Sequence, residues 1–528
     1  MAGLPVPSTP GRLILALHIS PGGPVTKFFP VRLSLLLGLC ACSVLTTVGS
    51  DNGFFDSGKH LFVDDTEIQS KVNVVRSLSA PVRIPENPIV KPDQPWESTL
   101  TLQPGTVIYD EQEHIYKMWY NSLPTRSKPD IEEFICYATS EDGIHWTKPA
   151  LDLVEYRGSK ANNILLTWCS WTLSVIKDLH ESDPSKRYKL AYWDAHNVGK
   201  KGVRVAFSPD GIHWTEYENN PVIPMASSGD TFCVMQDPVT HQFWMYHKSG
   251  IMPVRKVSRL VSEDFIHWKN DELVLEPDAL DQTDTEFYGL SPFPYGNQYL
   301  GLLWVFHTYS QQIDIQFVSS RDGRTWNRSM HRRVFFPLGF MKNDYDGHAF
   351  DSEMIMAIAP PVEVNDEIWM YYTGYSNKHN ANTYEEALED TYLGLIGVAK
   401  VPMDDFCFLA ATSEGSVVTK PMRITGATMH VTAATKSVGG RDQNFNPVWS
   451  QLFTNVKHGE GEVRIEVLDE QGKSIPGFTA ADCNPIKGPI ADREVTWAGG
   501  KSLSTLSGKS VRFKIILRDA EIYSYTVK

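Results

Sequence analysis

The chain has 528 residues, of which 42% are hydrophobic, 21% charged and 11% aromatic. This is the composition of an ordinary globular protein, and it excludes a disordered chain and a collagen-like repeat. Lys plus Arg number 49 and Asp plus Glu number 63, so the formal net charge is −14. A surface of that sign repels phosphate backbones and anionic headgroups, which argues against nucleic acid and membrane-surface partners and favours neutral or cationic substrates.

The first 50 residues predict a secretion signal. Arg32 precedes an apolar run over residues 33–48 that ends in small residues, so Asp51 is the expected first residue of the mature protein. The polar stretch before Arg32 is long for a signal peptide, which leaves a type II membrane anchor open as the alternative. Beyond this segment we expect no contact with a membrane.

The cysteines predict neither a disulfide framework nor a metal site, because their spacing fits neither pattern. Five of them remain after the signal, and we expect mostly core residues with at most one or two bridges: Cys136, Cys169, Cys233, Cys407 and Cys483. We expect no metal and no cofactor. One N-glycosylation sequon begins at Asn327, so the protein is expected to be a glycoprotein if its host is eukaryotic.

A short motif recurs four times and predicts repeated β-hairpins. It places Ser, Asp and Trp at fixed spacing, with Gly after the Asp in three copies, over residues 140–146, 208–214, 262–268 and 320–326. Asp bonds to the backbone that follows it and Gly adopts a positive φ, so the pair favours a tight turn. Each Trp opens another short strand, and we expect Trp146, Trp214, Trp268 and Trp326 to be largely buried.

The repeated units predict a β-propeller. A second hairpin lies upstream of each motif, which makes four strands per unit at a period of about 60 residues. A fifth unit without the motif covers residues 354–401, so we expect five blades over residues 58–408. The apolar strand at residues 59–64 is expected to complete the last blade and close the ring.

The chain changes character at about residue 412. Long alternating strands follow at residues 462–468 and 510–517, which is typical of sheets with one buried face and predicts a β-sandwich module over residues 412–528. The predicted fold class is therefore all-β: a five-bladed β-propeller followed by a C-terminal β-sandwich.

This arrangement resembles the secreted glycosidases of the invertase, levansucrase and arabinanase group, and in particular its invertase-like branch. The resemblance covers residues 58–528 and is carried by the four turns, residues 95–97, residues 284–294 with Phe287, Tyr288 and Gly289, the pair Phe350 and Asp351, and residues 508–525. It implies a glycoside hydrolase or transglycosylase that acts on a neutral glycan through two carboxyl groups. One would protonate the leaving oxygen, and the other would attack the sugar or activate water.

In a propeller these groups converge at the mouth of the central channel, where the innermost strand of each blade begins. The acids before those strands are the candidate catalytic residues: Glu97, Asp230, Glu286 and Asp351, with Asp284 and Glu353 nearby. Glu97 is the first choice, because Trp96 beside it offers a stacking face and an apolar wall that raises a carboxyl pKa. The candidate substrate-binding residues are Trp96, Trp171, Asp284, His307 and His348. For Trp171, His307 and His348, packing in the core is the open alternative. The polar loop at residues 376–390 could form the rim of the pocket, and the alternative is that it is only solvated surface.

Several departures limit the resemblance. The group's Asn-Asp-Pro and Glu-Cys motifs are absent, and Asp237, in a partial match to a third motif, fits a hairpin turn better, so fructosidase activity is not supported. A non-catalytic carbohydrate-binding propeller is the main alternative, and a sialidase-like propeller is a weaker one. A phosphate-using phosphorylase would require two or more Arg, Lys or His beside the acids. His145, His213 and His267 recur on different blades and are expected to be structural, not metal ligands.

Overall fold

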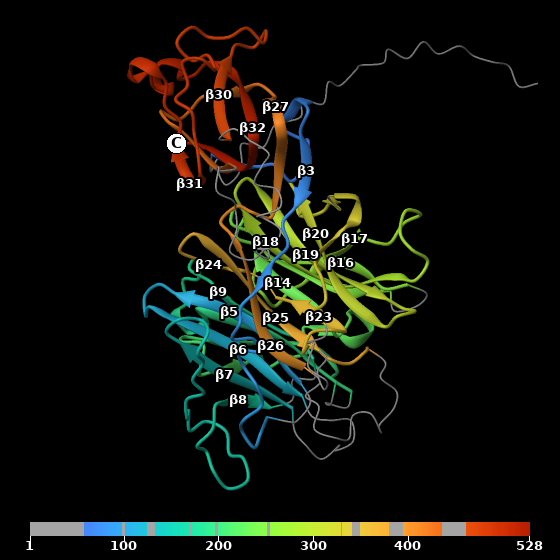
Figure 1. Cartoon of the computed structure of the whole chain (residues 1–528). Coiled ribbons are helices and arrows are strands. Elements are labelled where there is room, and N and C mark those ends of the chain that lie inside the picture. The colour runs from blue at the N-terminus through green and yellow to red at the C-terminus, as the bar shows by residue number, and fades with distance from the viewer. Residues whose placement is uncertain are drawn as a thin grey trace, which may run out of the picture. The chain divides into compact units, whose positions relative to one another are not determined.

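The computed structural model describes residues 58–97, 101–123, 133–167, 171–195, 199–250, 254–328, 330–340, 349–358, 360–379, 394–435 and 461–528. These residues form β-strands joined by turns (Figure 1). Five short 3-10 segments accompany them: η1 (Pro184–Lys186), η2 (Met225–Ser227), η3 (Met330–Arg332), η4 (Ala498–Gly500) and η5 (Leu503–Leu506). Within the described ranges there is no α-helix, and no helix long and apolar enough to cross a membrane. The all-β class is confirmed. The expected signal segment lies outside the described residues.

Most strands fall into five antiparallel groups in chain order. Group 1 contains β5 (Thr101–Asp110), β6 (Ile115–Leu123), β7 (Phe134–Ser140) and β8 (Ile164–Thr167). Group 2 contains β9 (Leu173–Lys177), β10 (Tyr188–Asp194), β11 (Gly202–Ser208), β12 (Thr215–Glu216) and β13 (Ile223–Pro224). Group 3 contains β14 (Phe232–Gln236), β15 (Phe243–Ser249), β16 (Lys256–Ser262) and β17 (Lys269–Leu275).

Groups 4 and 5 complete the series. Group 4 contains β18 (Thr285–Tyr295), β19 (Gln298–His307), β20 (Gln312–Ser320), β21 (Trp326–Asn327) and β22 (Val334–Phe336). Group 5 contains β23 (Met354–Ala357), β24 (Val362–Val364), β25 (Glu367–Tyr375) and β26 (Gly394–Pro402), with β4 (Val82–Arg83) paired to β26.

The five groups contact one another in a closed cycle. Strand β5 contacts β9, β9 contacts β14, and β14 contacts β18. A parallel bridge joins Ile313 of β20 to Met354 of β23, and a second joins Gly394 of β26 to Thr101 of β5. This cycle favours the predicted ring, and the count of five blades stays a prediction.

Side-chain hydroxyls tie the first strands of neighbouring groups together. The Thr106 hydroxyl of β5 accepts a hydrogen bond from the Val175 N–H of β9 at 2.9 Å. The Ser291 hydroxyl of β18 lies 3.2 Å from the Cys233 thiol of β14 and donates to the Ala357 carbonyl of β23 at 2.6 Å. Such contacts satisfy polar groups that no continuous backbone ladder reaches at these boundaries.

The recurrent motif forms the predicted tight turn. In the second copy, the Ser208 hydroxyl accepts from the Gly211 N–H at 2.9 Å, and Asp210 Oδ1 accepts from the Ile212 and His213 N–H groups at 2.8 Å each. Gly211 has a φ of +81°, a conformation that glycine adopts without strain. His213 Nδ1 lies 2.7 Å from the Asp210 carboxylate.

The other two motif histidines, His145 and His267, make the same contact, with Asp142 and Asp264. Each therefore has a local structural role at its own turn. The described ranges also hold no group of three or more His, Cys, Asp or Glu side chains arranged to bind a metal ion.

Each of three turns also receives a hydrogen bond from the preceding group. The Trp119 indole of β6 donates to the Gly211 carbonyl at 2.7 Å, and the Tyr246 hydroxyl of β15 donates to the Gly323 carbonyl at 2.7 Å. The Tyr371 hydroxyl of β25 donates to Gly143 at 2.9 Å, which connects group 5 to group 1. The motif therefore joins neighbouring groups as well as reversing the chain.

The motif Trp residues are less buried than predicted. Trp326 is 8% exposed, whereas Trp146, Trp214 and Trp268 are only half-buried. Each of these three indoles donates to a carbonyl of its own turn, at 3.0–3.1 Å. All three rings also pack against apolar clusters, so the prediction of burial is confirmed for Trp326 and confirmed in part for Trp146, Trp214 and Trp268.

The remaining strands form one nine-stranded sheet. It contains β1 (Lys59–Leu61), β2 (Ile68–Val72), β3 (Val75–Leu78), β27 (Cys407–Thr419), β28 (Met422–Arg423), β29 (Met429–Thr435), β30 (Glu462–Leu468), β31 (Pro489–Glu494) and β32 (Ser510–Val527). Figure 1 shows β3 beside β27, to which it is paired. The long strand β32 joins this sheet together, since it pairs with β1, β27, β28, β29 and β30.

The expectation that residues 59–64 close the ring is wrong, because β1 pairs with β32 instead. Its apolar run has another cause: Leu61 and Val63 pack in a cluster with groups 4 and 5, while Phe62 packs in the core of the nine-stranded sheet. Both faces are therefore buried. Strand β4 covers the edge of group 5 instead.

The nine-stranded sheet also takes residues from both ends of the chain. Strand β27 begins at Cys407, ahead of the boundary expected at residue 412, and residues 59–78 pair here instead of in the ring. The division into domains at 58–408 and 412–528 stays a prediction.

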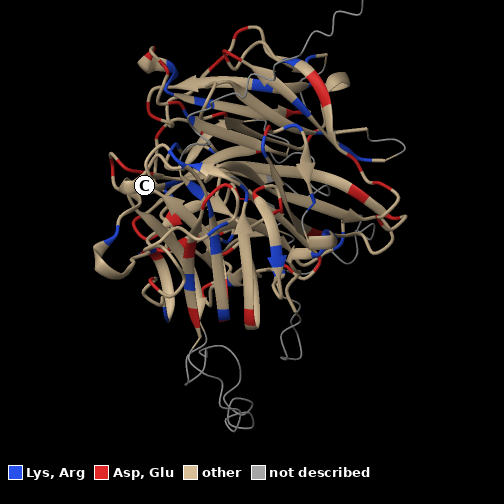
Figure 2. Cartoon of the chain, turned by 90° about the horizontal axis from the view of Figure 1, so that it is seen from above, with Lys and Arg blue, Asp and Glu red and all other residues tan. Residues whose placement is uncertain are grey.

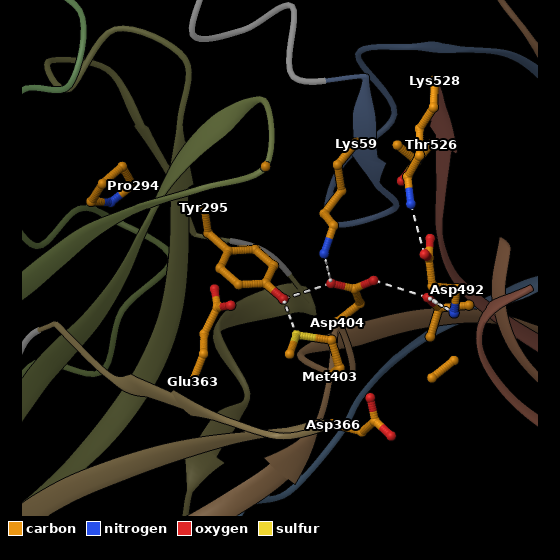
Figure 3. Close-up of a pocket in the computed structure, with 13 residues that line it drawn as sticks. Lys59, Pro294, Tyr295, Glu363, Asp366, Met403, Asp404, Asp492, Thr526 and Lys528 are labelled. Carbon is orange, nitrogen blue, oxygen red and sulfur yellow. Dashed lines mark hydrogen bonds and ion pairs between the residues drawn. The ribbon is translucent and has the colours of Figure 1, made fainter. Parts of the chain in front are cut away.

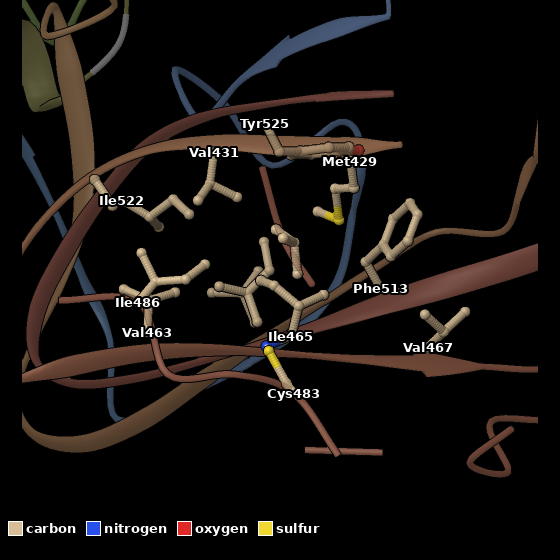
Figure 4. Close-up of a cluster of buried hydrophobic side chains, with 14 of the residues drawn as sticks. Met429, Val431, Val463, Ile465, Val467, Cys483, Ile486, Phe513, Ile522 and Tyr525 are labelled. Carbon is tan, nitrogen blue, oxygen red and sulfur yellow. The ribbon is translucent and has the colours of Figure 1, made fainter. Parts of the chain in front are cut away.

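A single apolar cluster fills the nine-stranded sheet (Figure 4). The first half of β32 alternates between buried and half-buried residues, as its sequence predicts, and Val431, Ile465 and Phe513 meet inside. Cys483 lies in this core, and the four described cysteines are all buried, which confirms them as core residues. Cys169 lies outside the described residues.

Candidate functional site

Two of the predicted acids lie at the start of neighbouring inner strands. Asp230 precedes β14 of group 3, and Glu286 is the second residue of β18 of group 4. Asp230 Oδ1 lies 2.5 Å from Lys248 Nζ, and Glu286 forms an ion pair with Arg255. The side chain of Asp230 is 35% exposed and that of Glu286 is 13% exposed, so both remain open to solvent.

The ring of Tyr288 links these two ion pairs. Lys248 Nζ lies 4.1 Å from the ring centre, and the Arg255 guanidinium carbon lies 5.6 Å from it. The Tyr288 hydroxyl lies 2.9 Å from His379 Nε2. Burial raises the pKa of Tyr288, and the positive charges of Lys248 and Arg255 oppose that shift. Its hydroxyl therefore keeps its proton at neutral pH and is able to donate it in a hydrogen bond.

Local backbone geometry sets this arrangement. Strand β18 pairs with β19 in regular register except for a bulge between Phe287 and Gly289, which leaves Tyr288 outside the ladder. Bulges of this kind redirect side chains and occur often beside active sites. A Cβ on Gly289 would lie 2.9 Å from the Trp304 ring of β19 and 3.2 Å from the Thr231 side chain, so glycine leaves room for the Trp304 ring at the bulge.

Trp171, a predicted substrate-binding residue, is next in the chain to a residue that contacts the Asp230 backbone. Its side chain is 38% exposed, and the next residue, Thr172, donates from its hydroxyl to the Asp230 carbonyl at 2.7 Å. Asn121 fixes the backbone here by donating to the Trp171 carbonyl. An exposed indole provides a flat apolar face against which a sugar ring can stack.

His307 and Asp284 lie at the same end of group 4 as Glu286. Thr285 pairs with His307 across β18 and β19, and the Asp284 carbonyl accepts from the Thr308 N–H at 2.8 Å. His307 Nε2 lies 3.0 Å from Asp314 Oδ2. This hydrogen bond raises the pKa of His307, and burial opposes the shift.

Glu353 lies before β23 of group 5. The Gln312 side-chain amide donates to its carboxylate at 3.0 Å, and its own carbonyl accepts from the Ile313 N–H at 3.2 Å. Gln312 pairs with His307 across β19 and β20, so this acid belongs to the same end of group 4 as His307.

Glu97, the first choice from the sequence, lies inside group 1. Its carboxylate is fully buried, and it accepts from the Tyr120 hydroxyl at 2.6 Å, from Lys148 Nζ at 2.7 Å and from the Asp93 N–H at 2.9 Å. These donors occupy the oxygens that a substrate would need. Trp96 is also taken up locally, because its indole donates to Asn163 at 2.7 Å.

Asp351 also has close partners on one oxygen, while its Oδ1 atom is buried without a hydrogen-bond partner among the described residues. It is 1% exposed, and its Oδ2 atom lies 2.5 Å from Arg83 Nε and 2.9 Å from the Tyr372 hydroxyl. Arg83 belongs to β4, so the ion pair holds that strand against group 5. Asp237 lies in the turn after β14, where its carboxylate accepts from the Thr240 N–H, which confirms it as a turn residue. His348 lies outside the described residues.

A cavity of about 550 Å³ lies at the opposite end of β18, between Tyr295 and the nine-stranded sheet (Figure 3). Ten residues of extended strand separate it from Glu286 by roughly 30 Å. Asp404 at its wall is 2% exposed and binds Lys59 at 2.8 Å, the Tyr295 hydroxyl at 2.6 Å and the Thr432 hydroxyl at 3.0 Å. These contacts fasten the sheet to groups 4 and 5, and they account for this carboxylate without a ligand.

No protein-family model and no curated protein matches the chain. Among solved structures, it is similar to a fructofuranosidase from Schwanniomyces occidentalis, with 13% identity, 84% of this chain and 96% of the other covered, and a TM-score of 0.40. It is also similar to an exo-inulinase from Aspergillus awamori, with 14% identity, 83% and 99% covered, and a TM-score of 0.37.

A thermostable family-43 glycoside hydrolase matches at 12% identity over 58% of this chain and 93% of the other, with a TM-score of 0.39. The glycosidase group that the sequence resembles is thus found again among solved structures. TM-scores of 0.37–0.40 do not support any conclusion about the reaction. The reaction is therefore argued below from the side chains of this chain alone.

Sequence reasoning missed the basic residues of the site. Lys248 ends an apolar strand and Arg255 follows a short loop, so neither stands in a pattern that marks a ligand. Tyr288 was named as part of the family resemblance, but no role was predicted for it. His379 lies in a loop that was predicted to be either the rim of the pocket or solvated surface. The bulge that brings them together is a tertiary feature, so the strand pattern alone did not reveal it.

Proposed function

We propose that the protein is a glycoside hydrolase or transglycosylase whose paired carboxylates are Asp230 and Glu286. The observation that carries this proposal is their position: both are partly exposed, both begin neighbouring inner strands, and their partner cations lie against the same ring of Tyr288. Glycosidases need two carboxyl groups on either side of one glycosidic bond.

The surroundings supply the other parts of such a site. Trp171 offers a stacking face near the Asp230 backbone, and the Tyr288 hydroxyl is a donor for a sugar oxygen. His307 and Asp284, at the same end of group 4, are candidates for binding sugar hydroxyls. We propose that a carbohydrate lies across this end of groups 2, 3 and 4.

One observation favours the alternative, a non-catalytic carbohydrate-binding protein. Both carboxylates are engaged by cations, so neither is free to meet a substrate while its ion pair is intact. Catalysis therefore requires that substrate binding releases one carboxylate from its cation, whereas simple binding does not.

The experiment is a turnover screen of the mature protein on glycans and aryl glycosides, repeated with Asp230→Asn and Glu286→Gln. Each variant is expected to lose about 10²-fold or more of the wild-type rate, as expected for loss of a general acid or base. Glu276→Gln is the matched control, because Glu276 is a half-exposed carboxylate in an ion pair with Lys256 at 2.6 Å, away from Tyr288. Glycan binding by a wild type that cleaves nothing would establish the binding alternative.

We also propose that the protein is secreted, on the basis of the apolar run at residues 33–48. N-terminal sequencing of protein recovered from the medium should begin at Asp51. A full-length, membrane-bound product would instead support the type II anchor.

A further inference from the structure

Three basic residues gather at the two acids, although the whole chain carries a net charge of −14. Over the strands as a whole, Lys and Arg are interspersed with Asp and Glu (Figure 2). At Tyr288, however, Lys248, Arg255 and His379 all contact one side chain. Lys248 is 4% exposed and Arg255 is 22% exposed, so both charges are largely withdrawn from water.

The two ion pairs leave hydrogen-bond donors unused. A lysine ammonium has three N–H groups and an arginine guanidinium has five. Lys248 contacts one oxygen of Asp230 and is also hydrogen-bonded to Tyr288, and Arg255 contacts Glu286 through one terminal nitrogen. Arg255 Nε is buried and has no hydrogen-bond partner in the described part of the chain. A buried N–H of this kind is costly unless a ligand or water meets it.

Neutral sugars do not account for this cluster. Their hydroxyls are bound by ordinary hydrogen bonds, and two withdrawn cations carry a desolvation cost that only negative charge offsets well. The planar fork of an arginine matches the oxygens of a carboxylate or phosphate in particular. The charge already present on Asp230 and Glu286 accounts for part of the pairing but not for the free Nε donor.

We propose that the site binds an oxyanion between Lys248 and Arg255, beside Tyr288 and His379. This inference rests on the proposed function in one respect: the anion would lie next to the glycan at the same carboxylates. The shared chemistry is a group with two or more negatively charged oxygens. The group is either free phosphate or the carboxylate of an acidic sugar. In the second case the substrate is an acidic glycan and not the neutral glycan expected from the net charge.

The test is calorimetric titration of the mature protein with sodium phosphate, with sodium glucuronate and with glucose as the neutral control. At least one anion should bind the wild type, and Arg255→Gln and Lys248→Gln should each weaken that binding about tenfold or more. Lys256→Gln should bind as the wild type does, since Lys256 pairs with Glu276 at the surface. Arg255→Lys keeps the charge without the planar guanidinium, so its anion affinity should lie between those of the wild type and Arg255→Gln.

Binding of phosphate alone identifies a free anion, and binding of glucuronate alone identifies an acidic sugar; either supports the site. Failure of both anions to bind, or equal binding by wild type and Arg255→Gln, overturns it. These outcomes are independent of the proposed function: cleavage of glycosides without anion binding refutes only the oxyanion site, and anion binding without any cleavage refutes only the glycosidase.

Discussion

Replacement of Gly211 by alanine tests the conclusion that each turn is locked to the preceding group. Gly211 has a φ of +81°, and a Cβ there would lie 2.7 Å from Cζ2 of Trp119. Trp119 is fully buried, and its indole already donates to the Gly211 carbonyl at 2.7 Å, so it has no free direction in which to move.

Two terms set the expected cost. An alanine held at positive φ costs about 1–2 kcal/mol, and overpacking against a rigid ring costs a further 1–3 kcal/mol or so. Gly158→Ala is the matched control, because Gly158 has a φ of +85° and nothing lies within 4 Å of its Cβ position. It should show the first term alone, so Gly211→Ala is expected to be the less stable variant by roughly 1–3 kcal/mol.

The assay is urea unfolding followed by tryptophan fluorescence, with all variants compared at equal slope. A Trp119→Phe background removes the ring atom that the new Cβ would meet, so the added cost of Gly211→Ala should shrink there, as in a double-mutant cycle. Equal destabilisation by Gly211→Ala and Gly158→Ala, or an unchanged cost in the Trp119→Phe background, would refute the contact between turn and neighbouring group.

Three further predictions concern the candidate site and its surroundings. Glu97→Gln should lower the free energy of unfolding by about 1–3 kcal/mol, because Lys148 and the Tyr120 hydroxyl lose a buried carboxylate partner while Lys148 keeps only its ion pair with Asp93 at 2.7 Å. Turnover per folded molecule should stay the same; a folded variant without activity would restore Glu97 as a catalytic residue. The raised pKa of His307 means that its pairing with Asp314 stabilises the folded state below the ordinary imidazole pKa of about 6.5 and loses that effect as pH rises through the folded-state value. His307→Gln should therefore destabilise the protein more at pH 5.5 than at pH 8.5, and an equal loss of unfolding free energy at both pH values would contradict the assignment. Trp171→Ala should raise KM or glycan Kd by about tenfold, a loss of roughly 1.4 kcal/mol, without a change in unfolding midpoint; an unchanged affinity would return Trp171 to a packing role.

Sequence patterns predicted those features of the fold that depend only on residues within one strand or one turn. The Ser, Asp and Gly of each motif specify a turn by their own hydrogen bonds, and these appear as expected at Ser208, Asp210 and Gly211. Strand β1 was misplaced because its apolar run shows burial on both faces but not which sheets bury it.

The site was less predictable for a related reason. Proximity to an inner strand was the criterion, and it selected Asp230 and Glu286 together with Glu97 and Asp351, whose partners Lys148 and Arg83 come from distant parts of the chain. Whether an acid is free or engaged depends on those tertiary partners. The same is true of Lys248 and Arg255, which both contact Tyr288 at the bulge in β18.

The most direct test of the central claim is the double variant Asp230→Asn, Glu286→Gln beside its two single variants, on any glycoside that the wild type cleaves. Two carboxylates that act on one bond are strongly non-additive, so the double variant should be no slower than the slower single variant within a few-fold. Full turnover in either single variant, or losses that multiply as for independent sites, would contradict the assignment of Asp230 and Glu286 to one catalytic centre.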